Sequence, residues 1–255
     1  MSELNESNVL EIAEMLVTAT ENVEKVYDSG RQSEYDAFWE AFQQTGTRNN
    51  YSNAFRNGWD DTNFNPKYDI KPIRCDNAFT NSNITDIAAM FEKNGIVLDT
   101  SQSTDVKYMF TNMYNTLRIP TVSAEAAISL EGTFGWSRIE TIDKLILRND
   151  GTNTFTDTFN STTQLMNITI EGVIGNDINF RWCTKLSRAS IESIVNHLSD
   201  AAIGKTLTLS EAAVDTAFSG GQSAPDPSTT TEIGSSTVAW FDLYMSKPNW
   251  TITLV

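Results

Sequence analysis

The sequence predicts an α/β solenoid with a parallel sheet, preceded by an N-terminal helical stalk, and three observations lead to this prediction. A degenerate unit of about two dozen residues recurs over 134–147, 159–170 and 180–186, in which a Phe is followed by Leu or Ile positions and a short apolar strand. The first 28 residues carry a heptad pattern, and the chain ends on an alternating strand. Because one unit of this size cannot bury its apolar face alone, the units are expected to stack on one another.

Residues 1–28 predict a helical oligomerisation stalk. Apolar residues recur there at alternating spacings of three and four, which is the a/d pattern of a coiled coil, and they are Val9, Ile12, Leu16, Ala19, Val23 and Val26. β-Branched residues at these positions favour three strands over two, so a parallel homotrimer is expected. The alternative is a single helix packed on its own domain.

Residues 29–70 predict an aromatic-rich helical adapter and connector. Tyr35, Phe38, Trp39 and Phe42 follow helical spacing, which predicts a buried stripe that seats the stalk. The stretch that follows is rich in Asn, Gly and Asp, but it also contains aromatic residues from Tyr51 to Phe64. Free linkers lack aromatic residues, so this connector is expected to be irregular but packed.

Residues 71–218 predict the repeat body. The phenylalanines taken to begin its units are Phe79, Phe91, Phe110, Phe134, Phe159 and Phe180, with irregular early spacing that suggests a cap. The apolar tripeptides are expected to align in one continuous parallel sheet. Its inward residues would be Leu145, Leu147, Ile168, Ile170, Leu207, Leu209, Ile252 and Leu254.

Local patterns assign the rest of the chain. Helical spacing is present over 187–198 and 210–218, and strand alternation over 205–209. Residues 219–236 predict a Gly, Ser, Pro and Thr surface loop, and residues 237–255 a capping helix and strand.

The outward face of the predicted sheet is the candidate ligand face, because solenoids bind through their extended regular surfaces. Its residues are Lys144, Arg148, Asn167, Thr169, Glu171, Thr206 and Thr208. The alternative is that this face is simply solvated.

Charge excludes two classes of partner. The chain has 33 acidic and 18 basic residues, a net charge of −15, which disfavours nucleic acid and anionic lipid because both bind through Lys and Arg. No apolar run is long enough for a membrane span, and the acidic start MSELNESNVLEIAEM is unlike a secretory signal. Cys75 and Cys183 predict two reduced, buried thiols.

Motifs for catalysis are lacking in the sequence. His197 is the one histidine, its place in an apolar helical segment indicates a structural role, and no phosphate-binding or zinc-protease motif occurs. No two carboxylates stand out as a glycosidase pair. We therefore expect no catalytic, cofactor-binding or metal-binding residues.

The closing repeats carry a resemblance to a known family. Phe180-Arg-Trp-Cys183-Thr-Lys-Leu186 resembles the F-x-x-C-x-x-L repeat of bacterial and phage leucine-rich-repeat surface proteins. Residues 186–198, 204–209 and 247–254 are similar to the C-terminal ends of leucine-rich-repeat proteins encoded in phage structural regions, and residues 27–64 resemble the module that precedes their repeats. The units at Phe91 and Phe110 depart from the pattern because they lack the Cys.

This resemblance implies a non-enzymatic protein of a phage virion, in the tail, baseplate or a fibre. Such a protein would be assembled in the host cytoplasm, joined to other virion proteins through its N-terminal region, and would present a leucine-rich-repeat domain for adhesion to a host-surface glycan or protein. The alternatives are a virion assembly or capsid-decoration protein without receptor binding and, less favoured, a cell-wall or glycan depolymerase.

Overall fold

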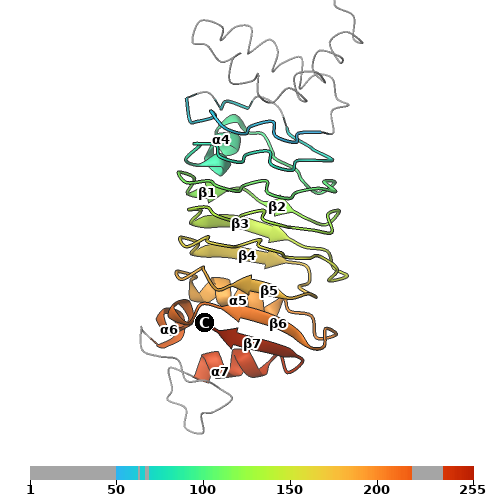
Figure 1. Ribbon diagram of the computed structural model, residues 1–255, viewed down its shortest axis with the longest axis vertical. Helices are drawn as coiled ribbons and strands as arrows, with labels where there is room; N and C mark the ends of the chain where they lie inside the picture. The colour runs from blue at the N-terminus through green and yellow to red at the C-terminus, as the bar shows by residue number, and fades with distance from the viewer. Residues whose placement is uncertain (1–49, 63, 67–68, 220–237) are drawn as a thin grey trace, which may run out of the picture.

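The computed structural model describes residues 50–62, 64–66, 69–219 and 238–255, which form a mixed α/β structure with two small parallel sheets (Figure 1). The predicted stalk, the adapter as far as residue 49 and loop residues 220–236 lie outside this described part. In the described part, successive turns of chain lie one on another along the long axis (Figure 1).

The first sheet lies in the middle of this stack. It contains β1 (Arg118–Ile119), β2 (Val122–Ser123), β3 (Thr141–Ile146) and β4 (Asn167–Glu171), and β3 pairs in parallel with each of the others. Leu145 lies opposite both Val122 and Ile170, and all three are buried. Identical strand positions on neighbouring turns therefore form one continuous apolar column.

The second sheet contains β5 (Ile178–Phe180), β6 (Lys205–Leu209) and β7 (Trp250–Leu254), again all parallel. The predicted single sheet is therefore wrong, because Leu145 and Ile168 belong to the first sheet, whereas Leu207 and Ile252 belong to the second. The arrows of β3 and β4 also point opposite to those of β5, β6 and β7 (Figure 1).

Helix α5 (Arg188–Asn196) explains why the first sheet stops at β4. The amides of Ile168 and Ile170 donate to the hydroxyl oxygens of Ser190 and Ser193, at 3.0 and 2.9 Å. The Ser190 hydroxyl also donates to the carbonyl of Met166, at 2.9 Å. Hydroxyls of the helix thus satisfy strand-edge groups that a fifth strand would otherwise have paired.

A ladder of phenylalanine rings runs through the core. Neighbouring rings lie with their centroids 4.3 to 6.0 Å apart, in the order Phe55, Phe79, Phe110, Phe134, Phe159 and Phe180. Phe55, from the predicted connector, is thus part of the stack. Phe91 does not begin a repeat as predicted, because it lies in α4 (Ile87–Asn94) and packs edge-on against Phe64.

The backbone around each ring explains the regularity of the ladder. In five successive turns, the residues two before and two after the Phe have φ between +50° and +60°, and they are Asn53, Asn57, Asn77, Asn81, Tyr108, Asn112, Gly132, Trp136, Asp157 and Ser161. Asn tolerates this left-handed conformation, which accounts for its frequency here. The amides of Asn77, Phe79 and Asn81 donate to carbonyls of the next turn at 2.8 to 3.1 Å, and the following two turns repeat the pattern.

Small or soft side chains fill the position three residues after each Phe from Phe79 onward. These residues are Ser82, Met113, Ser137, Thr162 and Cys183, and all are buried. The hydroxyls of Ser137 and Thr162 both donate to the carbonyl of Phe134, at 2.6 and 2.8 Å. Among the described residues, Trp240 Nε1 is the one buried side-chain nitrogen or oxygen without a hydrogen-bond partner. The two cysteines are free and buried, as predicted.

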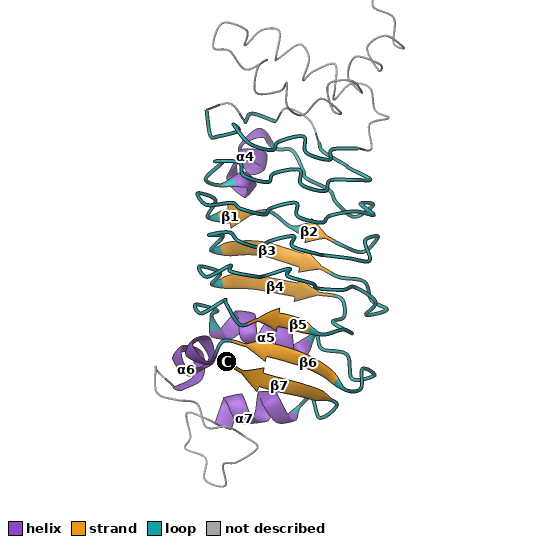
Figure 2. Ribbon diagram, in the orientation of Figure 1, coloured by secondary structure: helices purple, strands orange, loops and turns teal. Residues whose placement is uncertain are grey.

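Helices α5, α6 (Glu211–Ser219) and α7 (Val238–Met245) gather at the C-terminal end, whereas α4 lies near the other end of the described stack, and most of the remaining described chain runs as turns and loops (Figure 2). Helices α5, α6 and α7 confirm the helical predictions for these segments, and β6 and β7 confirm the two strands. Trp240 of α7 is fully buried, with its ring centroid 5.5 Å from that of Phe218 in α6.

Candidate functional site

The predicted ligand face is divided between the two sheets. Lys144, Asn167, Thr169 and Glu171 lie on β3 and β4, and Arg148 follows β3 closely. Thr206 and Thr208 lie on β6 in the other sheet. The seven residues therefore do not form the single face that the sequence predicts.

The charges on the β3 and β4 part of this face are already paired. Lys144 lies 2.5 Å from Glu171, and the Arg148 guanidinium lies 2.6 Å from Asp150. Hydrogen bonds from Arg148 and from Thr152 hold the pKa of Asp150 well below its usual range. This surface therefore offers a ligand little unpaired charge.

A cleft opens where the ladder of turns meets the second sheet. In the turn before the junction, Phe159 follows Phe155 by four residues, whereas Phe180 follows Ile178 by only two, and the chain there is the extended strand β5. Within the described residues, no backbone hydrogen bond joins the turn at 155–161 to β5. Extended backbone points its amides and carbonyls differently from alternating left- and right-handed backbone, so the two cannot pair along their length.

Polar side chains line most of this cleft. Its volume is about 510 Å³, and its polar lining includes Thr156 and Asp157 from the turn, Asn176, Asp177 and Asn179 from the β5 region, and Thr206 and Thr208 from β6. An adjoining hollow of about 290 Å³ shares Phe155, Asp157 and Asn179 and extends to Asn160, Arg181 and Trp182. We name the two together the junction cleft.

Hydrogen bonds hold several lining side chains in place. Asp177 accepts from the amide of Thr206 at 2.7 Å, and Asn179 accepts from the amide of Arg181 at 2.9 Å. The Asn160 amide group donates to Asp157 at 3.0 Å. Each bond uses only one of the polar atoms of its side chain, so the Asn179 amide nitrogen and the second Asp157 oxygen remain available to a ligand.

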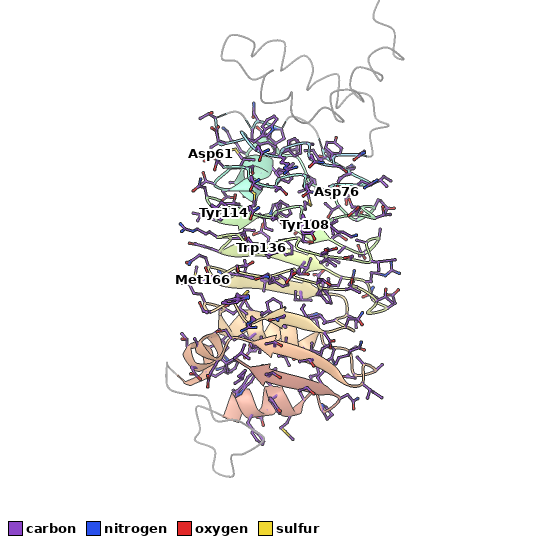
Figure 3. The ribbon with its side chains drawn as sticks, in the orientation of Figure 1. Asp61, Asp76, Tyr108, Tyr114, Trp136 and Met166 are labelled. Atoms are coloured by element: carbon purple, nitrogen blue, oxygen red, sulfur yellow. The ribbon has the colours of Figure 1, made fainter. Side chains whose placement is uncertain are left out.

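An exposed aromatic residue borders the junction cleft. Trp182 is 43% exposed, and the Arg181 guanidinium lies over its ring, 4.9 Å from the centroid. Trp136 occupies the same position two residues after its own Phe, is 37% exposed and has a φ of +53° (Figure 3). The apolar core pattern of the units does not point to either tryptophan, whereas aligning the units on their Phe places both at the same position.

A second hollow, of about 700 Å³, lies on another part of the described stack. Its lining includes Asn83, Asn115, Tyr114, Arg138 and Glu140. The Asn115 amide group donates to Asn83 at 2.9 Å across neighbouring turns. Tyr114 is 56% exposed, so its ring is a second exposed aromatic surface, away from the junction cleft.

The histidine and the two cysteines, side chains that enzymes often use in catalysis, have structural roles here. His197 ends α5, where its Nδ1 lies 2.7 Å from the carbonyl oxygen of Ser193. Burial raises the pKa of the Cys75 thiol to about 12 and that of Cys183 well above its ordinary value. In the part of the chain covered by the structure, no three His, Cys, Asp or Glu side chains form a group that could hold a metal ion.

Comparison with known proteins gives no match: no family model, no curated protein and no solved structure is similar to this chain. Among the helices of the described ranges, none is long and apolar enough to cross a bilayer.

Proposed function

We propose that the chain is a leucine-rich-repeat solenoid and a structural protein of a phage virion, in the tail, baseplate or a fibre. It presents its stacked body for host-surface recognition and does not catalyse a reaction. The observation that carries the repeat assignment is the phenylalanine ladder, with one ring in each successive turn.

The hydrogen bonds support a solenoid as well. Amides around Phe79 donate to the turn of Phe110, those around Phe110 to the turn of Phe134, and those around Phe134 to the turn of Phe159. Contacts that reach only the neighbouring unit are typical of repeat proteins. Helix α4 is then an insertion within one unit, and α7 with β7 forms the C-terminal cap.

Recognition is supported by the place of the junction cleft. Both of its walls belong to hydrogen-bonded layers with buried rings beneath them, so its polar side chains are held on a rigid framework. The acidic composition agrees with a partner other than nucleic acid or anionic lipid. Trimerisation through residues 1–28, and attachment to other virion proteins through that region, remain part of the proposal.

Immunolabelling of phage particles tests this function. Antibodies against the full chain should label virions from the source lysate in electron micrographs, and the purified chain should compete with these virions for adsorption to host cells. Unlabelled particles would refute the virion assignment. Labelled particles whose adsorption is unaffected by the chain would refute the recognition role.

A virion assembly or capsid-decoration role is the second candidate, and the paired charges on β3 and β4 favour it. Such a surface can be buried against another subunit without leaving a charge unpaired. Replacing Lys144, Arg148, Asn167 and Thr169 by Ala distinguishes the two roles. Failed assembly with normal adsorption by the remaining particles would favour the assembly role.

A further inference from the structure

We propose that the junction cleft binds a neutral oligosaccharide of pyranose sugars, with Trp182 as the stacking surface at one end. This inference rests on the proposed recognition function and names its ligand class. A pyranose ring has an apolar C–H face and an edge of hydroxyl groups. A ligand of this kind needs an aromatic face beside paired donors and acceptors, which the junction cleft provides.

The polar side chains of the junction cleft can form hydrogen bonds with sugar hydroxyl groups. Asp157 and Asn179 line both parts of the cleft, and each has one polar atom committed and another available. A carboxylate oxygen accepts from one sugar hydroxyl while an amide nitrogen donates to the next. The side chains of Thr206 and Thr208, from the predicted ligand face, supply hydroxyls that act in either direction.

The charges favour a neutral ligand. Asp157 and Asp177 both line the cleft, and Arg181 is the one cation among its lining residues in the described chain. Arg181 is already held over the Trp182 ring. An anionic sugar would meet two carboxylates, in a protein whose net charge is −15.

Trp136 extends the site along the stack. It lies two turns from Trp182 at the equivalent position, and Ser161 occupies that position in the turn between them. The turns of Phe134 and Phe159 pair as neighbouring strands do and are about 5 Å apart, whereas the unpaired junction cleft separates Ser161 from Trp182.

The test uses the full purified chain on an array of neutral and anionic bacterial oligosaccharides, with affinities measured by isothermal titration calorimetry, whose signal does not depend on the tryptophans that the variants remove. We expect binding to a neutral chain, weakened about tenfold or more by Trp182→Ser. Trp136→Asn should weaken longer oligosaccharides more than short ones, and its Asn matches the residue found at the equivalent position in three other turns. Tyr114→Ala is the matched control and should bind like the unaltered chain.

Several outcomes would overturn the inference: no binding to any neutral member, binding that survives Trp182→Ser, or equal loss with Tyr114→Ala. Affinity that falls steeply with salt would indicate an anionic ligand and would also overturn it. Circular dichroism confirms that each variant is folded. Release of sugar fragments during the assay would indicate the depolymerase alternative.

A separate measurement distinguishes failure of this inference from failure of the proposed function. Host cells are treated either with periodate, which oxidises vicinal sugar hydroxyls, or with protease, and binding of the full chain is measured. Loss only after protease would mean that the receptor is a protein, so that recognition stands and the sugar site fails. If the chain binds a sugar on the array but binds no host cell, the sugar site stands and the host-recognition function fails.

Discussion

Single atoms decide whether neighbouring turns can approach one another, and Gly172 shows this most sharply. It has a φ of +83°, and a Cβ built there would lie 2.2 Å from the carbonyl oxygen of Leu147. We expect Gly172→Ala to lower the free energy of unfolding by about 2 to 4 kcal/mol, through both the clash and the left-handed backbone. Urea unfolding monitored by circular dichroism measures it.

Gly204 is the matched control for this prediction. Its φ is +68°, but nothing lies within 4 Å of a Cβ built there. Gly204→Ala should therefore cost only the backbone component, about 1 kcal/mol. Equal losses at the two positions would show that the close approach of residue 172 to residue 147 is unimportant.

The buried thiols make alkaline stability a second prediction at this scale. Burial raises the pKa of Cys75 to about 12 and raises that of Cys183, whereas an unfolded thiol titrates near 9.0. Above pH 9 the unfolded chain loses thiol protons that the folded chain keeps, so this contribution to stability is complete below pH 9 and is lost as the pH rises. We expect iodoacetamide, which reacts with the thiolate, to alkylate neither cysteine at pH 10 until denaturant unfolds the chain. Thiolate in the native protein at that pH would contradict the burial of both groups.

At the scale of elements, a helix replaces a strand beside β4, and Ser190 is the residue that makes this replacement possible. Its buried hydroxyl accepts from the amide of Ile168 and donates to the carbonyl of Met166. We expect Ser190→Ala to cost about 1 to 3 kcal/mol, because the buried amide of Ile168 loses its partner, whereas the Met166 carbonyl still accepts from the amide of Ser187. Hydrogen exchange at Ile168 should accelerate. Thr169→Ala, on the exposed face of the same strand, should change stability by less than about 0.5 kcal/mol, and equal effects would contradict the assigned role of Ser190.

The elements also show which parts of the fold could be predicted from the sequence. Helical spacing over 187–198 and strand alternation over 205–209 are local signals, and both predictions are correct. The division into two sheets depends on serine hydroxyls meeting a strand that lies about twenty residues earlier, and no local pattern reports that contact. Phe91 was misassigned although a signal existed, since Asp86 and Gly95 are typical residues for the two ends of a helix.

Part of the candidate site could also be predicted from the sequence, and part could not. Thr206 and Thr208 were predicted as outward residues of a strand, and they line the junction cleft. Lys144 and Arg148 were predicted with them but lie on the other sheet, in ion pairs. The cleft itself arises because the unit at Ile178 is two residues shorter than the unit at Phe155, so its walls could not be predicted without the geometry of both turns.

At the scale of the whole molecule, excess negative charge opposes a stack held together by neighbouring contacts. Even if each of the 18 cations paired with a separate acid, 33 − 18 = 15 acids would remain unpaired. Two cations of the described ion pairs each bind two acids, Arg74 with Asp76 and Asp105 and Arg118 with Glu92 and Asp143, which leaves still more acids unpaired. Repulsion among the remaining carboxylates should therefore exceed the stabilisation from surface pairs, which are individually weak.

Salt dependence tests this balance. Raising sodium chloride from about 20 mM to about 500 mM at neutral pH should stabilise the full chain by about 1 kcal/mol, a rise of about 2 to 4 °C in Tm. Screening shortens the Debye length to about 10 Å by 0.1 M, so most of the rise should occur at low salt, whereas a general salting-out effect would grow steadily with concentration. A Tm that falls with salt would mean that ion pairs such as Arg118–Asp143 contribute more than the excess charge removes.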